Sequence, residues 1–266
     1  MKTIIRAVAV LLVVALSAAC LTSGNNGLPT GRITLQALPV SAGHHVRNAN
    51  GASTNWSGYI AASTLVAPPV GSVSDVKGTW VVPTVTGVGN AAAYSAAWVG
   101  IDGFSDTTVE QIGTASDWTK RGPSYYAWIE MYPQGSYLIN GFPVRPGDTI
   151  SAEVQYAGNN VFTLNMTNVT RRIRFSMNMH SPSAKRESAE WIMEAPSSKT
   201  VLPLADFHAI NFSGCTATVS GQTGGINDPL WENDVINMET ASGVMKAQTS
   251  VLSANGENFS VSWEHQ

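Results

Sequence analysis

Three glutamates lie in short segments that are otherwise apolar or aromatic. In a β-strand successive side chains point to opposite faces, so Glu130 shares a face with Tyr126 and Trp128, and Glu190 shares one with Glu194. Neighbouring strands of this kind would present carboxylates among aromatic side chains. That arrangement suits a substrate cleft, because a positioned carboxyl group can accept and return a proton during catalysis. Alternation alone leaves a second interpretation open, in which these are chance glutamates on a solvated sheet face.

Most other catalytic chemistry has no motif in this chain. His-Glu-x-x-His does not occur, and the histidines after residue 54 are widely spread, at positions 180, 208 and 265, so we expect no zinc site. Phosphate loops, dinucleotide fingerprints and Gly-x-Ser-x-Gly elbows are also missing from the sequence, and we expect no cofactor. Cys215 could pair with a histidine as a thiol nucleophile, but a lone cysteine is more often a buried apolar residue.

Short β-strands must position the acids, because no helical period is sustained after residue 54. Segments rich in Val, Ile, Thr, Tyr, Trp and Phe alternate with turn signals such as Asn140-Gly141 and Asn255-Gly256. This pattern predicts an all-β fold, a sandwich or barrel of two large antiparallel sheets in a single domain over residues 55–266. The expected strands are 75–83, 94–100, 124–132, 148–156, 161–168, 171–179, 187–194, 215–219, 243–252 and 259–264.

Charge is scarce and unevenly placed. Charged residues make up 12% of the chain, against roughly 25% in an average soluble protein. The first 54 positions carry four bases and no acid; the part from Asn55 onward holds the other 11 bases with all 18 acids, a net charge of −7. Because a phosphate backbone demands clustered Lys and Arg, we expect no nucleic-acid partner.

The basic leader has two parts. Residues 1–19 carry Lys2 and Arg6 before an apolar run that ends in small residues, which predicts a secretory signal peptide rather than a membrane span. Cys20 follows in a stretch that resembles a bacterial lipoprotein box, so a lipid anchor at Cys20 is an alternative outcome of export. Residues 20–54 show no sustained apolar period, and their composition leaves a flexible linker and a basic propeptide as equal interpretations.

Four segments of the body resemble the glutamic peptidase (eqolisin) family, in the family's order and with its spacing. The likeness runs from about Asn55 to the end of the chain. The segments are Asn55-Trp56-Ser57-Gly58-Tyr59, similar to the family's mature amino terminus; Ala97-Trp98-Val99-Gly100-Ile101-Asp102-Gly103 followed by Glu110-Gln111-Ile112-Gly113; Tyr126-Ala127-Trp128-Ile129-Glu130-Met131-Tyr132-Pro133; and Ala189-Glu190-Trp191-Ile192-Met193-Glu194.

The resemblance implies a secreted, pepstatin-insensitive acid endopeptidase that acts on polypeptide substrates. Its fold would be a concanavalin-like sandwich whose concave face forms the cleft, and its catalytic pair would be Gln111 and Glu190. The substrate-binding residues that it implies around this pair are Trp98, Asp102, Tyr126, Trp128, Glu130 and Glu194. The chain departs from the family's pattern at Ile112, where Thr is expected, and it lacks the cysteine pairs of some members.

The chemistry of such a pair is physically sensible. Glu190 as a carboxylate can take a proton from water and return it to the leaving nitrogen. The Gln111 carboxamide offers N–H donors to the developing oxyanion and a carbonyl to hold the water. Since Gln cannot ionise, a single glutamate must act as the base, and the ordinary Glu pKa of about 4.3 is compatible with work in acid.

Two other function classes fit an all-β body. One is a non-catalytic, lectin-like module that binds carbohydrate or protein through aromatic side chains. The other is a glycosidase that uses Glu130 and Glu190 as its two carboxylates; it gives the pattern around Gln111 no role.

We expect a monomer whose own leader is its inhibitor. The family's members have a basic propeptide, so the resemblance favours a propeptide over a linker for residues 20–54. Arg32 and Arg47 with His44 and His45 would face a body of net charge −7, so a 21–54 peptide should inhibit more at pH 7 than at pH 3.

Overall fold

The computed structural model describes residues 33–39, 52–87 and 91–266. The chain divides into two compact units, Met1–Thr30 and Gly31–Gln266, and every described residue belongs to the second. The predicted signal peptide and Cys20 therefore lie outside the described residues, as do leader positions 40–51. Across the described ranges there is no helix, and so none that could cross a membrane. The prediction of an all-β fold is confirmed.

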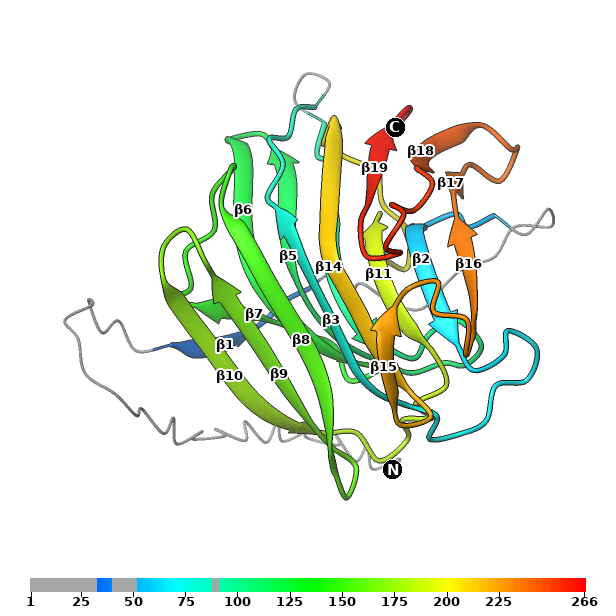
Figure 1. The fold of residues 1–266 in the computed structure, drawn as a ribbon. Helices are drawn as coiled ribbons and strands as arrows, with labels where there is room; N and C mark the ends of the chain where they lie inside the picture. Colours follow the sequence, from blue (N-terminus) through cyan, green and yellow to red (C-terminus); the bar gives the residue numbers. More distant parts are fainter. Residues whose placement is uncertain (1–32, 40–51, 88–90) are drawn as a thin grey trace, which may run out of the picture. The chain divides into compact units, whose positions relative to one another are not determined.

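The strands form two large sheets in which all pairs of named strands are antiparallel (Figure 1). The 8-stranded first sheet has the order β1 (Thr34–Ala37), β7 (Ser136–Asn140), β6 (Gly122–Tyr132), β5 (Val109–Thr119), β4 (Ala96–Ile101), β11 (Ala189–Glu194), β2 (Trp56–Ala62) and β16 (Glu232–Ile236).

The second sheet is 9-stranded. Its order is β10 (Ile173–His180), β9 (Val161–Asn168), β8 (Thr149–Gly158), β3 (Val73–Val81), β14 (Ala209–Val219), β19 (Phe259–Trp263), β18 (Met245–Thr249) and β17 (Met238–Glu239), with β15 (Gln222–Gly225) pairing to β14. A separate two-stranded ribbon joins β12 (Ser197–Ser198) to β13 (Thr200–Val201).

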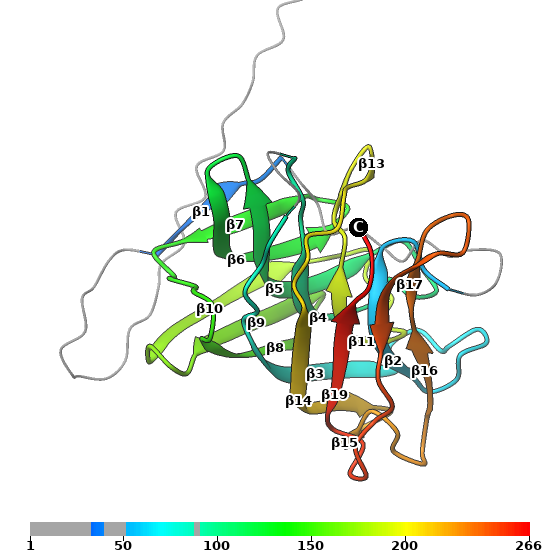
Figure 2. The same ribbon diagram turned by 90° about the horizontal axis from the view of Figure 1, so that it is seen from above.

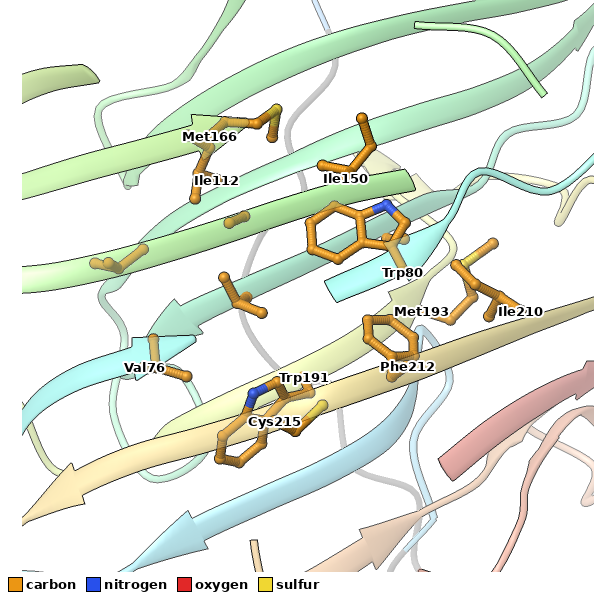
Figure 3. Packing of buried hydrophobic residues seen from close by; sticks show 14 of the residues in the cluster. Val76, Trp80, Ile112, Ile150, Met166, Trp191, Met193, Ile210, Phe212 and Cys215 are labelled. Atoms are coloured by element: carbon orange, nitrogen blue, oxygen red, sulfur yellow. The ribbon is translucent and has the colours of Figure 1, made fainter. Parts of the chain in front are cut away.

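The main core lies between the two sheets (Figure 3). Alternate residues of each strand point into it, as period 2 requires, so Ile112 and Trp191 of the first sheet meet Trp80 and Phe212 of the second. The buried indole N–H groups are satisfied across the gap: Trp80 Nε1 donates to Thr114 Oγ1 at 2.9 Å, and Trp191 Nε1 to the Lys77 carbonyl at 2.7 Å. These contacts fix which face of the first sheet turns outward.

A smaller apolar cluster covers the outer face of the first sheet, away from the second sheet. It contains aromatic and aliphatic side chains from six strands: Trp56, Ile60, Ala96, Trp98, Val109, Ala115, Trp128, Ile192 and Ile236. The faces predicted from alternation are correct, because Trp128 and Ile192 lie in this cluster while Ala127, Ile129 and Trp191 lie in the inter-sheet core.

Some strands carry no clear sequence signal. β9 spans 161–168 as predicted, but β5, which carries Gln111, and β2 were not among the expected strands. Both have a neighbouring strand on each side in the first sheet and are buried on both faces. Such strands lose the alternation of polar and apolar residues that marks a half-exposed strand.

Candidate active site

Strand register places the predicted catalytic pair and two further residues in one row across the first sheet. Glu190 pairs with Gly100, Gly100 with Gln111, and Gln111 with Glu130. Residues paired in this way point to the same face, and that face is the outer one. We call this set the central row. It continues through Glu130 to Ser136 on β7.

Gly100 leaves the space between the two predicted catalytic side chains open. Glu190 and Gln111 are two strands apart, so their Cα atoms are separated by roughly 10 Å. A Cβ atom on Gly100 would lie 2.9 Å from the Trp98 ring and 3.1 Å from Gln111 Cβ. The absence of a side chain therefore leaves Glu190 and Gln111 facing one another across bare backbone.

Gln111 is held by its neighbour in the row. Its Nε2 donates a hydrogen bond to Oε2 of Glu130 at 3.0 Å. Its Oε1 is buried and has no hydrogen-bond partner within the described part of the chain. The contact fixes the orientation of the carboxamide and leaves its carbonyl oxygen available.

Glu190 is buried completely, and neither carboxylate oxygen has a partner at hydrogen-bond distance among the described residues. Burial raises the pKa of Glu190 well above its usual value; the nearby Ser188 hydroxyl opposes the shift, and the charges of Asp102, Asp106 and Glu110 add to it. Buried polar atoms are normally satisfied. Two unsatisfied oxygens on one buried acid therefore point to a group that receives its hydrogen bonds from water or a ligand.

The aromatic side chains form a second row beside the central one. Trp98 pairs with Gly113, and Gly113 with Trp128. A Cβ on Gly113 would lie 2.6 Å from Trp98 Cβ and 2.9 Å from Trp128 Cζ2, so this glycine allows the two tryptophans to approach. Trp56 packs edge-on against Trp98, with ring centroids 4.9 Å apart.

Glu194 anchors this aromatic wall. Trp98 Nε1 donates to Glu194 Oε2 at 2.7 Å, and Asn55 Nδ2 donates to Oε1 at 3.3 Å. Burial raises the pKa of Glu194, and the Trp98 indole opposes the rise while the charge of Glu130 adds to it. Glu194 therefore orients Trp98 and ties the start of β2 to the site.

Tyr126 lies in the next row along β6, paired with Ala115. Its hydroxyl donates to Oδ2 of buried Asp117 at 3.0 Å. Burial raises the pKa of Asp117 to about 7, although the Tyr126 hydroxyl and the Ser95 amide oppose the shift. Tyr126 also lines a pocket of about 410 Å³ beside the site, together with Leu38, Pro39, Tyr94, Ser124, Tyr125 and Leu138.

Asp102 lies at the end of β4, where it holds a loop. Its Oδ2 accepts hydrogen bonds from the amides of Lys185 and Arg186 at 2.7 and 2.6 Å, and its Oδ1 accepts one from Glu187 at 2.6 Å. Burial raises the pKa of Asp102, and these three donors oppose the rise. This placement favours a positioning role for Asp102 over the substrate contact that we expected, because the loop leads directly into β11.

The structure thus brings together seven of the eight predicted site residues on one face, and leaves Asp102 at its margin. Sequence reasoning missed Asn55 and Trp56 as parts of the site, and Gly100 and Gly113 as the residues that make room in it. The signal for the first two was their own motif, Asn55-Trp56-Ser57-Gly58-Tyr59. The glycines could be recognised only once the strand register was known.

Potential metal ligands and the Cys215 thiol were the other candidates for chemistry in the described part of the chain. No group of three or more His, Cys, Asp or Glu side chains there could hold a metal ion. Cys215 is free, wholly buried in the inter-sheet core, and burial raises the pKa of its thiol. Both the burial and the raised pKa disfavour a thiolate nucleophile at this position.

Comparison with known proteins decides the family. The sequence profile of the Peptidase A4 family matches residues 54–263. The chain belongs to the Peptidase A4 family. Scytalidopepsin B of Scytalidium lignicola is 30% identical over 210 residues, which cover 74% of this chain and 76% of the relative. Aspergillopepsin-2 of Aspergillus niger is 27% identical over 235 residues, 79% of this chain and 78% of the relative.

Solved structures of Peptidase A4 proteins share the fold. Scytalido-glutamic peptidase with a transition state analog inhibitor superimposes with a TM-score of 0.65 at 27% identity, over 79% of this chain and 98% of that one. Aspergilloglutamic peptidase from Aspergillus niger gives a TM-score of 0.58 at 27% identity, over 65% of this chain and 99% of that one. The predicted resemblance is confirmed, and the lectin-like alternative is not favoured.

Ile112, where the chain departs from the family's pattern, lies on the inter-sheet face of β5. Ile112 is fully buried in the inter-sheet core and pairs with Val99 and Ile129. It points away from Gln111, so its change from Thr alters the core of this Peptidase A4 protein and not the outer face.

Proposed function

We propose that this Peptidase A4 protein is a secreted acid endopeptidase in which Glu190 and Gln111 form the catalytic pair. One observation carries the proposal: both side chains lie in the central row on either side of Gly100, and the two Glu190 carboxylate oxygens and Gln111 Oε1 have no hydrogen-bond partner among the described residues. The family's name supports peptide-bond hydrolysis. The roles of the individual residues are the proposal.

Glu190 is the proposed general base and general acid. As a carboxylate it accepts a proton from the attacking water, whose oxygen bonds to the scissile carbonyl carbon. The same proton then passes to the nitrogen as the C–N bond breaks, which leaves one carboxylic acid and one amine. Both Glu190 oxygens are unengaged by the described residues, so one can hold the water while the other faces the leaving group.

Gln111 is proposed to stabilise the oxyanion and to hold the attacking water. Its second Nε2 hydrogen can be donated to the oxyanion, because Glu130 uses the first. Its Oε1 can accept a hydrogen bond from the water. Loss of one oxyanion donor typically lowers turnover by about 10²–10³.

Burial favours the protonated form of Glu190 before substrate binds. The raised pKa of Glu190 means that the acid keeps its proton to a higher pH than a free glutamate. Water and peptide N–H groups that donate to its oxygens would lower this pKa and release the base. We therefore expect the acid limb of the pH–activity profile to report the ionisation of Glu190.

Activity is tested on a denatured protein substrate at pH 2–5 with pepstatin present. Glu190→Gln and Gln111→Ala should each reduce cleavage at least 100-fold while the fold is retained by circular dichroism. Glu110→Gln is the matched control, because Glu110 is equally buried but pairs with Ile101 and Met131 on the inter-sheet face. Full activity in either catalytic variant would refute the assignment.

Export through residues 1–19 is part of the same proposal, and the cationic start and apolar run support it. Amino-terminal sequencing and mass spectrometry of the protein from the culture medium distinguish the two outcomes. A free amino terminus after residue 19 or later indicates secretion, whereas an acylated Cys20 in the membrane fraction indicates the lipid anchor.

A further inference from the structure

The leader contributes a strand to the first sheet. β1 pairs antiparallel with β7, from Thr34 opposite Asn140 to Ala37 opposite Tyr137, and the Leu38 amide donates to the Ser136 carbonyl at 2.9 Å. Figure 1 and Figure 2 both show β1 beside β7 at the edge of the sheet. A strand thus forms in a segment whose sequence shows no sustained apolar period.

The register of β1 reaches the central row. Ser136 pairs with Glu130, and Leu38 donates to Ser136, so Leu38 extends the row by one strand. Leu38 packs against the outer apolar cluster, whereas Leu35 packs against the inter-sheet core. Leu38 and Pro39 also line the pocket beside Tyr126.

β1 is held mainly by its backbone. Three of its four residues are exposed. Among its side chains, Gln36 accepts a hydrogen bond at Oε1 from Asn140 Nδ2, at the long distance of 3.3 Å. Residues 33–39 carry no charge. Contacts of this kind accept many sequences, because main-chain bonds supply the affinity and pockets for alternate side chains supply the preference.

β7, which β1 covers in this structure, differs in composition from the outermost strands β16 and β10. An exposed edge tends to pair with other chains, and proteins usually protect it with charge, proline or a short length. β16 carries Glu232 and Asp234, and β10 carries Arg174 and His180. β7, with the sequence Ser-Tyr-Leu-Ile-Asn, has neither charge nor proline, so once the leader is gone its edge is left open to strand addition.

We propose that the open edge of β7 is a docking site for extended polypeptide substrate, which the leader strand at 33–39 occupies in the full chain. This inference rests on the proposed function for the identity of the second occupant. Substrate adds as a strand in place of β1 and puts an apolar side chain into the Leu38 position beside Tyr126. The leader inhibits by holding the edge that substrate needs.

The geometry makes this a remote site. Leu38 is three strands from Gln111, roughly 15 Å between Cα atoms at about 5 Å per strand. An extended chain covers about 3.3 Å per residue, so roughly five residues separate the docked segment from the scissile bond. Long substrates should use the edge, and peptides of four residues centred on the scissile bond should not.

Binding is tested on a leader-free body, residues 54–266, that carries Glu190→Gln so that nothing is cut. The Peptidase A4 profile matches residues 54–263, and the superposition covers 98% of the chain of a solved relative, so we expect the body to fold without the leader. A fluorescent peptide of residues 33–39 with both termini blocked should bind saturably, and its affinity should change little with salt because none of its side chains is charged. Salt-independent binding also separates this contact from any attraction due to Arg32 and Arg47.

Two N-methylated peptides give the matched comparison. In an antiparallel pair the amides of alternate residues point toward the partner. N-methylation of Leu38 removes the donor to Ser136 and should weaken binding at least tenfold, whereas N-methylation of Ala37 alters an amide that points away from β7 and should change affinity less than twofold. Amide exchange should slow at Leu138 and Asn140, which face β1. Equal affinities, or no binding, would overturn the proposal.

Kinetics connect the edge to substrate. The 33–39 peptide should raise the KM of the active body for casein without lowering kcat, and should leave cleavage of a tetrapeptide unchanged. Inhibition of both substrates alike would place the peptide in the catalytic site and refute the remote edge. If the body cuts nothing, the proposed function fails, while the binding and exchange results still decide whether β7 is a strand-docking edge.

Discussion

Gln111 Nε2 donates a hydrogen bond to Oε2 of Glu130, at 3.0 Å, within one row of the first sheet. The bond leaves the carboxamide with one N–H and one oxygen that have no hydrogen-bond partner among the described residues. In the proposed mechanism Glu130 acts through Gln111, as a positioning residue.

Removal of this acceptor should mainly affect kcat. Glu130→Ala leaves Gln111 free to rotate, and we expect kcat to fall at least tenfold with KM within about threefold. Glu130→Gln keeps a carbonyl oxygen that can accept the same bond, so its kcat should stay within about threefold of the parent. If the two variants lose activity equally, the charge of Glu130 matters and the positioning role is wrong.

Gly100→Ala tests the gap between the catalytic side chains. The added methyl would lie 2.9 Å from the Trp98 ring, 3.1 Å from Gln111 Cβ and 3.1 Å from the Glu110 carbonyl oxygen. Since two of these neighbours belong to the site, we expect kcat/KM to fall at least 30-fold. Overpacking of this kind typically costs about 1–3 kcal/mol of stability. A thermal unfolding scan shows whether the variant remains folded at the assay temperature, and unchanged kcat/KM in folded protein would contradict the prediction.

The sequence predicted which side chains share a face of a strand, but it did not predict which strands pair or in what register. Alternation in 125–132 and 188–194 assigned Glu130, Glu190 and Glu194 to their faces correctly, because the side-chain period of a strand is fixed by its backbone. Glu190 and Gln111 face one another because β11 pairs with β4 and β4 pairs with β5. Glu190 and its partner Gly100 are ninety residues apart in the chain. Long-range pairing of this kind leaves no local pattern, and only the family resemblance joined the two residues beforehand.

β1 was missed for a different reason. Residues 34–37 are Thr-Leu-Gln-Ala, too short and too weakly apolar to stand out from a linker. Its strand forms by antiparallel pairing with β7, from Thr34 opposite Asn140 to Ala37 opposite Tyr137, along an edge whose side chains carry no charge. The partner, rather than the segment itself, determines the structure.

Asp102→Asn should loosen the loop that precedes Glu190. Asp102 accepts three backbone N–H bonds of 2.6–2.7 Å on its two oxygens. Asparagine replaces one oxygen with an NH₂ group that faces a donor. Hydrogen bonds to charged groups contribute roughly 1.5–3 kcal/mol each, so we expect destabilisation of about that size and faster amide exchange at Lys185, Arg186 and Glu187.

Asp106→Asn is the control for this loop. Asp106 accepts from the amides of Gly103 and Thr108 through the same Oδ1 atom, at 3.1 and 3.0 Å. An asparagine carbonyl can keep both bonds, so the free energy of unfolding should change by less than about 1 kcal/mol at pH 5. Equal destabilisation by the two substitutions would mean that the charge around the loop, and not the pattern of donors, stabilises it.

The stability of the fold should decrease as pH rises. Burial raises the pKa of Glu110, Glu190 and Glu194 well above the ordinary value, whereas the unfolded chain releases these protons near pH 4.3. Above that pH the folded state binds more protons than the unfolded state, so the free energy of unfolding falls with pH until the folded groups ionise. The midpoint of thermal unfolding should be highest in acid and lower at pH 7.

Glu110 tests this effect at an acid outside the central row. It faces the inter-sheet side, where Ser181 Oγ donates to its Oε1 at 2.7 Å, and the charges of Asp102 and Asp106 add to the rise that burial causes in its pKa. Glu110→Gln keeps an acceptor for Ser181 and cannot ionise, so it should raise the melting temperature at pH 7 and change it little at pH 4. Each pKa unit removed corresponds to about 1.4 kcal/mol. An equal change at both pH values would show that packing at Glu110, and not its proton, sets the pH dependence.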